Sequence, residues 1–194
     1  MPYQILNNYT LVLGSNSPRR KQFLTDLGLT FVVRASDIDE VYPPELQREQ
    51  ITDYIAKLKA SAIELTADDE ILITSDTTVW SEGKSLGKPQ DRTEALAMLE
   101  RLSGKMHEVI TSICLTSTQK NHCFHALTEV HFKPLTRAQM EYYIDTYKPY
   151  DKAGGYGIQE WIGLVGIQRI NGSYTNIVGL PTTELMEELI QFIK

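Results

Sequence analysis

The sequence predicts an α/β fold, because short runs typical of buried strands alternate with longer amphipathic runs typical of helices. The chain has 194 residues, 42% of them hydrophobic, so it can bury one sizeable core or two smaller lobes. No internal repeat, low-complexity tract or linker interrupts the alternation. We therefore expect a single domain over residues 1–194.

Charge and cysteine content limit the possible partners and compartments. The formal net charge is −6, which argues against nucleic acid or an anionic membrane as a partner. An anionic substrate would need local basic groups or a bridging metal ion. The only two cysteines, Cys114 and Cys123, have no metal-ligand spacing and suggest no disulfide framework, which fits a reducing compartment. Without a signal peptide or an apolar run of membrane length, we expect a cytoplasmic protein.

The first predicted strand and helix meet in a turn suited to bind an anion. An apolar run opens the stretch 11–20, and Ser17 is a good N-cap with Pro18 at the first helical position. Arg19 and Arg20 follow, at a helix N-terminus whose free N–H groups and dipole attract anions. Their guanidiniums would add bidentate phosphate contacts, so we predict a phosphate site. The alternative is an ordinary helix start with a solvated basic face.

A second strand over residues 31–35 leads into an acidic loop at residues 36–40, which contains three carboxylates. Such a loop is often only a polar turn. The alternative is that Glu40 helps to hold a hard cation such as Mg²⁺.

Residues 47–65 have the apolar spacing of a helix. Its predicted apolar face consists of Ile51, Ile55, Leu58, Ala62 and Ile63. Lys59 falls within this face, whereas Lys57 points the other way. A lysine on the buried side indicates an ammonium that reaches an anion, although it can also extend along the surface to solvent.

The next strand, residues 71–75, is predicted to place Asp76 at its C-terminal end, where open α/β sheets bind ligands. A carboxylate there can hold a metal or activate water, and the alternative is a capping or turn role. Residues 83–85 read Gly-Lys-Ser but lack the first glycine of a P-loop, so we exclude that motif. Lys88, in the following loop, offers another cation.

The second half of the chain continues the alternation and adds a glycine-rich loop at residues 151–159, which lets backbone approach a ligand closely. The four histidines lack ligand spacing. The predicted elements are a helix over 93–102, strands over 107–118 and 123–132, and a helix over 137–147. Strands over 164–170 and 174–178 follow, joined by a hairpin turn at Asn171-Gly172. Gly179-Leu180-Pro181 then opens a last helix that ends at Ile193.

Short motifs occur in a fixed order along nearly the whole chain. They are Ser15-Asn16-Ser17-Pro18-Arg19-Arg20, Lys59-Ala60, Ser75-Asp76-Thr77, Gly87-Lys88-Pro89, Leu102-Ser103-Gly104, Ala153-Gly154, Tyr156-Gly157-Ile158-Gln159, Asn171-Gly172-Ser173-Tyr174 and Gly179-Leu180-Pro181. Together they resemble the Maf proteins, the septum-formation-inhibitor family of nucleotide pyrophosphatases. The ordered set is far more specific than any one motif.

The resemblance implies a two-lobed α/β fold with a mixed sheet and a central cleft, similar to inosine triphosphate pyrophosphatases. It implies cleavage of a nucleoside triphosphate between the α and β phosphates, with a divalent cation (Mg²⁺ or Mn²⁺) and frequent homodimers. The motifs around Asp76 and Gln159 resemble the branch that hydrolyses dTTP and UTP. A role in clearing modified nucleotides and in cell division arrest is also implied.

The residue-level predictions agree with these implied roles. Asp76 would be the catalytic base or a metal-held carboxylate, with Glu40 sharing the metal. The predicted substrate-binding residues are Ser17, Arg19, Arg20, Lys59 and Lys88. By resemblance, Arg19, Thr77 and Gln159 select the base.

Two other functions remain open at this point. One is a non-enzymatic regulator of septum formation that binds nucleotide or nucleic acid, but a polyanion binder would need an extended basic face. The other is a hydrolase of modified purine triphosphates.

Overall fold

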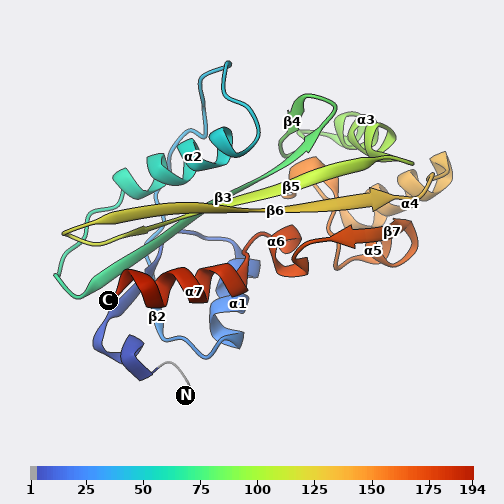
Figure 1. Cartoon of the computed structure of the whole chain (residues 1–194). Helices are drawn as coiled ribbons and strands as arrows, with labels where there is room; N and C mark the ends of the chain where they lie inside the picture. Colours follow the sequence, from blue (N-terminus) through green and yellow to red (C-terminus); the bar gives the residue numbers. More distant parts are fainter. Residues whose placement is uncertain (1–3) are drawn as a thin grey trace. The chain divides into compact units, whose positions relative to one another are not determined.

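The computed structural model describes residues 4–194 and has an α/β fold, as predicted (Figure 1). Its strands are β1 (Thr10–Leu13), β2 (Phe31–Val33), β3 (Glu70–Ser81), β4 (Lys84–Leu86), β5 (Met106–Thr116), β6 (Asn121–Phe132) and β7 (Ile167–Asn171). Its helices are α1 (Pro18–Asp26), α2 (Glu49–Ser61), α3 (Arg92–Leu102), α4 (Arg137–Tyr147), α5 (Trp161–Gly166), α6 (Tyr174–Val178) and α7 (Thr182–Phe192), with 3₁₀ turns η1 (Gln4–Asn8) and η2 (Ala153–Gly155).

The sheet is mixed, because β1 pairs in parallel with β2 and β3, whereas β4 and β7 pair antiparallel with β3 and β6. The strand order is β2-β1-β3-β5-β6-β7, with β4 beside β3. No helix within residues 4–194 combines the length and the apolar character that a membrane span requires.

The chain forms two compact units. The first contains the residues up to Asp76, Thr111–Ala126 and Gly179–Lys194, and the second contains Thr77–Ile110 and Leu127–Val178. Each unit has its own apolar core, and the long strands β3, β5 and β6 contribute residues to both. The single domain with a central cleft stays a prediction.

In the first unit, β1 lies between two parallel neighbours and is buried on both faces, which explains the continuous apolar runs in β1 and β3. Leu11 and Leu13 pack with α1 and α7 on one face. Val12 packs with Leu72 and Ile63 on the opposite face, where α2 lies (Figure 1).

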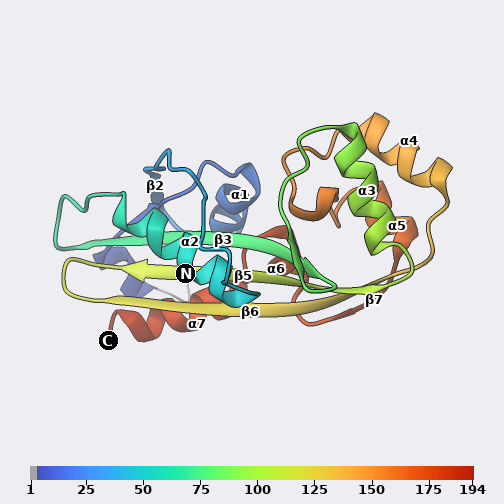
Figure 2. The same cartoon turned by 90° about the horizontal axis from the view of Figure 1, so that it is seen from above.

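In the second unit, β3 continues into a hairpin with β4 through Glu82 and Gly83, both with positive φ. Figure 2 shows α3, α4 and α5 gathered in this unit. Residues of these helices and of β3, β5 and β6 form its core.

The predicted hairpin at Asn171-Gly172 is wrong. Residues 161–166 are the helix α5, β7 begins only at Ile167, and residues 174–178 are the helix α6. The strand β7 pairs instead with β6, and the Ser173 side chain accepts a hydrogen bond from the Asn176 N–H at the start of α6. The buried Asn176 amide also donates to the Val109 carbonyl, which fixes the short helix in place.

The expectation about the cysteines is also wrong. Cys114 of β5 and Cys123 of β6 form a disulfide, with their Cα atoms 4.2 Å apart. The residues are nine apart in sequence, and only the folding back of the chain into neighbouring strands brings them together. The inference of a reducing compartment from these residues therefore loses its basis.

Candidate anion-binding site

The predicted turn between β1 and α1 has the expected cap. The Ser17 side chain accepts a hydrogen bond from the Arg20 N–H at 3.5 Å, and Pro18 opens the helix. The Ser17 N–H in turn donates to the Ser15 hydroxyl at 3.2 Å. Gly14 precedes this turn, and a Cβ there would lie 2.6 Å from a Thr74 methyl group. The turn can therefore approach β3 closely only because residue 14 has no side chain.

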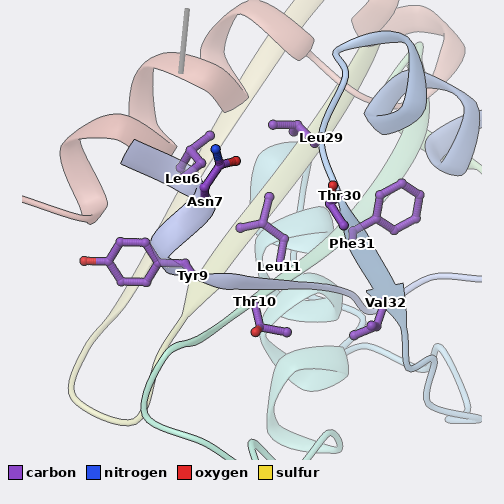
Figure 3. A pocket seen from close by; sticks show the side chains of 9 residues that line it. All are labelled: Leu6, Asn7, Tyr9, Thr10, Leu11, Leu29, Thr30, Phe31 and Val32. Atoms are coloured by element: carbon purple, nitrogen blue, oxygen red, sulfur yellow. The ribbon is translucent and has the colours of Figure 1, made fainter. Parts of the chain in front are cut away.

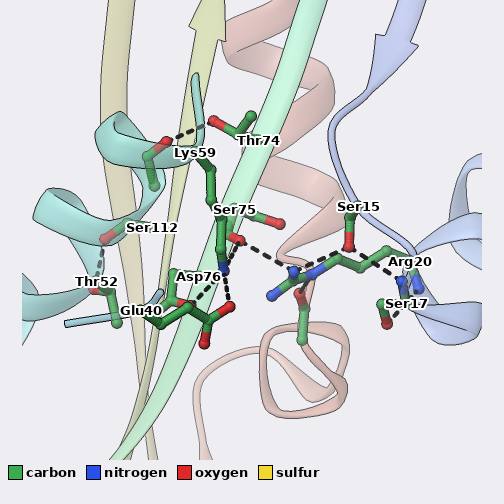
Figure 4. Close-up of polar contacts among 12 residues, drawn as sticks. Ser15, Ser17, Arg20, Glu40, Thr52, Lys59, Thr74, Ser75, Asp76 and Ser112 are labelled. Atoms are coloured by element: carbon green, nitrogen blue, oxygen red, sulfur yellow. Dashed lines mark hydrogen bonds and ion pairs between the residues drawn. The ribbon is translucent and has the colours of Figure 1, made fainter. Parts of the chain in front are cut away.

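Arg20 holds three segments of the first unit together. Its Nε donates to the Gly179 carbonyl at 3.0 Å, and its Nη1 donates to the Ser75 carbonyl at 3.0 Å and to the Ser15 hydroxyl at 3.3 Å (Figure 4). Burial lowers the pKa of its guanidinium, and the nearby Asp76 opposes that shift. Since a guanidinium keeps its proton in proteins, Arg20 holds a fixed positive charge near Asp76.

Lys59 bridges two carboxylates from different segments. Its Nζ lies 2.8 Å from Asp76 Oδ1 and 2.8 Å from Glu40 Oε1, and it also donates to the Ser75 carbonyl at 3.4 Å (Figure 4). The Lys59 side chain is only 12% exposed, whereas Lys57 is exposed, so the predicted phase of this helix is confirmed. The helix itself is shorter than predicted, because α2 spans only Glu49–Ser61.

Asp76 is the most buried acid of this cluster, with a side chain 14% exposed. Burial raises the pKa of its carboxyl group, while the charges of Lys59 and Arg20 oppose the shift. Its place in β3 differs from the prediction, because the strand continues to Ser81 and Asp76 lies within it. The parallel pairing of β1 with β3 nevertheless ends at Leu13 and Ile73. Asp76 therefore lies just beyond the carboxyl end of the parallel segment, where ligands are expected.

The carboxylates of Glu40 and Asp76 suit a small divalent cation that a substrate also helps to hold. Within residues 4–194, no group of three potential ligands among His, Cys, Asp and Glu is placed to bind a metal alone. Mg²⁺, however, commonly takes one or two carboxylates and completes its shell with phosphates and water. Two carboxylates that converge on one ammonium group match that partial set.

Arg19 is half-buried and belongs to the first unit, and the other predicted residues belong to the second. Lys88 and Gln159 are exposed, and Thr77 is half-buried on β3 next to Asp76 in sequence. The loop of Lys88 and the glycine-rich loop are joined by a hydrogen bond from the Gly154 N–H to the Gly87 carbonyl at 3.0 Å. The first unit thus contains Ser17, Arg19, Arg20, Glu40, Lys59 and Asp76, and the second contains Thr77, Lys88 and Gln159.

Two residues that contact Arg20, Ser15 and Gly179, were not predicted to have a role in the site. The Ser15 hydroxyl accepts from both the Ser17 N–H and Arg20, and the Gly179 carbonyl accepts from Arg20. A serine two residues before an N-cap serine is a usable local signal for the first contact. The Gly179-Leu180-Pro181 motif gives no local sign of the contact with Arg20, which spans 159 residues.

A separate surface pocket lies in the first unit (Figure 3). Residues of η1, β1 and β2, and of the segment that leads into β2, line it, and most of the contributing side chains are apolar. It contains none of the predicted site residues. We therefore attach no role in phosphate chemistry to it.

The lysines of α2 provide a direct test of the site. Lys59→Ala should lower kcat/KM about 30- to 150-fold, which corresponds to about 2–3 kcal/mol of lost transition-state stabilisation. The substitution removes charged hydrogen bonds and leaves Asp76 without its ammonium partner. Lys57→Ala, on the exposed side of the same helix, is the matched control and should change little. Steady-state kinetics with a nucleoside triphosphate would measure both, and equal losses would contradict the assignment.

Comparisons with known proteins agree over almost the full length of the chain. A family model described as Maf-like protein matches residues 10–192. A Bacteroides fragilis protein named dTTP/UTP pyrophosphatase is 52% identical over 188 residues, which cover 96% of this chain and 97% of that protein. A Christiangramia forsetii protein of the same name is 46% identical over 194 residues, covering 100% and 99% of the two chains.

Among solved structures, the Staphylococcus aureus Ham1 protein is similar, with a TM-score of 0.49 and 11% identity. The match covers 95% of this chain and 100% of that one.

Proposed function

Because the chain belongs to the family of Maf-like proteins, we propose that it hydrolyses UTP and dTTP to the nucleoside monophosphate and pyrophosphate. The observation that carries the proposal is the buried Asp76 carboxylate, held by Lys59 at 2.8 Å next to Glu40 and Arg20. Relatives at about half identity that are named dTTP/UTP pyrophosphatase support the substrate class. Acidic and basic side chains lie together beside β3, and this arrangement suits a small, highly charged substrate.

The proposed reaction is an in-line attack of water on the α-phosphorus. Asp76 orients the water and accepts its proton as the new bond to phosphorus forms. The bond from that phosphorus to the α–β bridging oxygen breaks, and pyrophosphate leaves. Lys59 and Arg20 stabilise the negative charge that develops on the phosphate oxygens.

A divalent cation, Mg²⁺ or Mn²⁺, held by Asp76 and Glu40, would supply further charge neutralisation and lower the pKa of the attacking water. In this scheme the Lys59 ammonium offsets the repulsion between the two carboxylates when no cation is bound. The hard oxygen donors of both residues suit such an ion.

The other proposed contacts follow the predicted roles. Ser17, Arg19 and Lys88 bind phosphate oxygens, and Gln159 reads the base together with Arg19 and Thr77. We also propose a cytoplasmic protein that forms homodimers, clears modified nucleotides and contributes to cell division arrest. The non-enzymatic regulator has no supporting observation, since the chain carries a net charge of −6.

The first product distinguishes this reaction from other triphosphate hydrolyses. Purified protein with UTP and Mg²⁺ should release pyrophosphate and UMP, because attack occurs at the α-phosphorus. Excess chelator should abolish the reaction, since the cation supplies charge neutralisation that the protein lacks. Product analysis with and without inorganic pyrophosphatase would measure this. Orthophosphate as the first product, or full activity in chelator, would refute the proposal.

A further inference from the structure

A network within the second unit holds the glycine-rich loop and has no part in the proposed reaction. We propose that Tyr143, Lys152 and Glu160 form a clamp that positions Gln159, which lies within the loop, to read the base. We call these three residues the loop clamp. The inference rests on the proposed function, because it assigns these residues a part in base selectivity.

The loop clamp joins both ends of the loop to its middle. Lys152 Nζ lies 3.1 Å from Glu160 Oε1, so an ion pair connects the two ends. The Tyr143 hydroxyl, on α4, donates a hydrogen bond to Glu160 Oε2. The same hydroxyl accepts a hydrogen bond from the Gly157 N–H at 2.9 Å. One phenol therefore orients both the carboxylate and the loop backbone.

The clamp residues are buried enough for their pairing to matter. The side chains of Lys152 and Glu160 are 11% and 18% exposed, and Tyr143 is fully buried. Burial and the hydrogen bond with Glu160 both raise the pKa of Tyr143, so its hydroxyl stays protonated and can donate. Lys152 also pairs with Asp151 at 2.6 Å, but the Asp151 side chain is 61% exposed, so Glu160 is the more buried of its two partners. Truncating Glu160 removes that buried partner and the acceptor of the Tyr143 hydroxyl, which makes the paired loop conformation preferred.

The loop backbone fits against the clamp without spare room. A Cβ at Gly157 would lie 2.9 Å from the Glu160 carboxyl carbon and 3.0 Å from Lys152 Cε. Ile158, the next residue, is buried with 6% exposure, whereas Gln159 is exposed. Gln159 thus lies between a buried apolar anchor and the clamped Glu160. The backbone on both sides of Gln159 is fixed, which restricts where its amide can point.

The clamp also bears on the loop of Lys88. Gly154, inside the clamped segment, donates its N–H to the Gly87 carbonyl, one residue before Lys88. A loop released from the clamp would therefore loosen a proposed phosphate contact as well as the base reader. We expect substrate binding to suffer more than the chemical step, because Asp76 and Lys59 lie outside this network.

Clamp variants should lose base selectivity while keeping most of their turnover. Glu160→Ala should lower the ratio of kcat/KM for UTP over CTP by about tenfold or more, the scale of one lost hydrogen bond to a charged group. KM for UTP should rise, and kcat should stay within about threefold. Glu160→Gln keeps an acceptor for Tyr143 and should retain more selectivity than Glu160→Ala.

Tyr143→Phe should act in the same direction, since it removes the hydroxyl and leaves the Gly157 N–H without that acceptor. Tyr142→Phe is the matched control, because Tyr142 is the neighbouring tyrosine of α4, is 51% exposed and packs its ring against Trp161. Hydrogen exchange gives a readout independent of activity. Peptides over residues 152–160 should exchange faster in Tyr143→Phe than in the parent or in Tyr142→Phe.

The outcomes separate this inference from the proposed function. Selectivity that falls in Glu160→Ala and Tyr143→Phe, but not in Tyr142→Phe, supports the clamp. Suppose that the parent prefers UTP and that the clamp variants keep the parent's UTP-over-CTP ratio of kcat/KM or its hydrogen-exchange rates. That result overturns the clamp proposal alone. A parent with no preference for UTP over CTP overturns the proposed base reading and the clamp's role together.

Discussion

Asp76→Asn should lower kcat for UTP hydrolysis by at least about a hundredfold, the usual contribution of a general base or of metal-activated water. The amide matches the carboxylate in shape but cannot accept the proton of the attacking water. It is also a far weaker ligand for a divalent cation. The fold should survive, because the substitution removes a buried charge and leaves Lys59 paired with Glu40. Single-turnover kinetics and thermal unfolding would measure both effects.

A matched control comes from the surface of α4. Asp145 forms an exposed ion pair with Arg92, in which Nε lies 2.8 Å from Oδ1. Asp145→Asn makes the same chemical change outside the site and should leave kcat nearly unchanged. If Asp76→Asn were as active as Asp145→Asn at equal thermal stability, Asp76 would have only a structural role.

UTP and dTTP should be preferred over CTP by more than about a hundredfold in kcat/KM, with purine nucleotides poorer still. A pyrimidine 2,4-dione presents two carbonyls and a ring N–H, whereas cytosine has an amine in place of one carbonyl and lacks the N–H. The Gln159 amide can donate to a carbonyl and accept from the N–H. A site with these groups rejects cytosine, because the polar atoms of the site are then left unpaired.

Gln159→Glu should erode this preference, because a carboxylate cannot donate to the carbonyls. Competition between UTP and CTP in one reaction would measure the ratio directly. The exposed Gln168 of β7 offers a control, since Gln168→Glu changes the same charge on the same unit. A variant at position 159 that kept the full preference would show that another group reads the base.

Local sequence patterns predicted most elements because the local signals and the packing agree. The run 137–147 has its Thr136 cap and capping box, and α4 spans Arg137–Tyr147 as predicted. The apolar spacing predicts the phase of α2 correctly and places Lys59 on the side of the acidic cluster. Ala62 was assigned to the apolar face but is exposed, because α2 ends at Ser61.

The errors arose where distant partners decide the structure. Asn171-Gly172 has the composition of a hairpin turn, but the buried contacts of Asn176 with Val109 and Thr128 favour a helix after it. The predicted strand over residues 71–75 ends before Asp76, whereas β3 continues to Ser81, where it pairs with β4. The sequence predicts Glu40, Lys59 and Asp76 as site residues. It does not predict that the Lys59 ammonium pairs with both carboxylates, because no short pattern encodes that tertiary contact.

The bond between Arg20 and the Gly179 carbonyl has a consequence for synthesis of the chain. The two residues are separated by 159 positions, so the contact forms only after nearly the entire polypeptide has been made. Ribosomes release the N-terminal segments first, so Arg20 emerges long before its acceptor at Gly179. A nascent chain that still lacks Gly179 contains β1 and α1, but it holds Arg20 with an incomplete set of acceptors. The full set of Arg20 contacts beside Asp76 is therefore completed only late in synthesis.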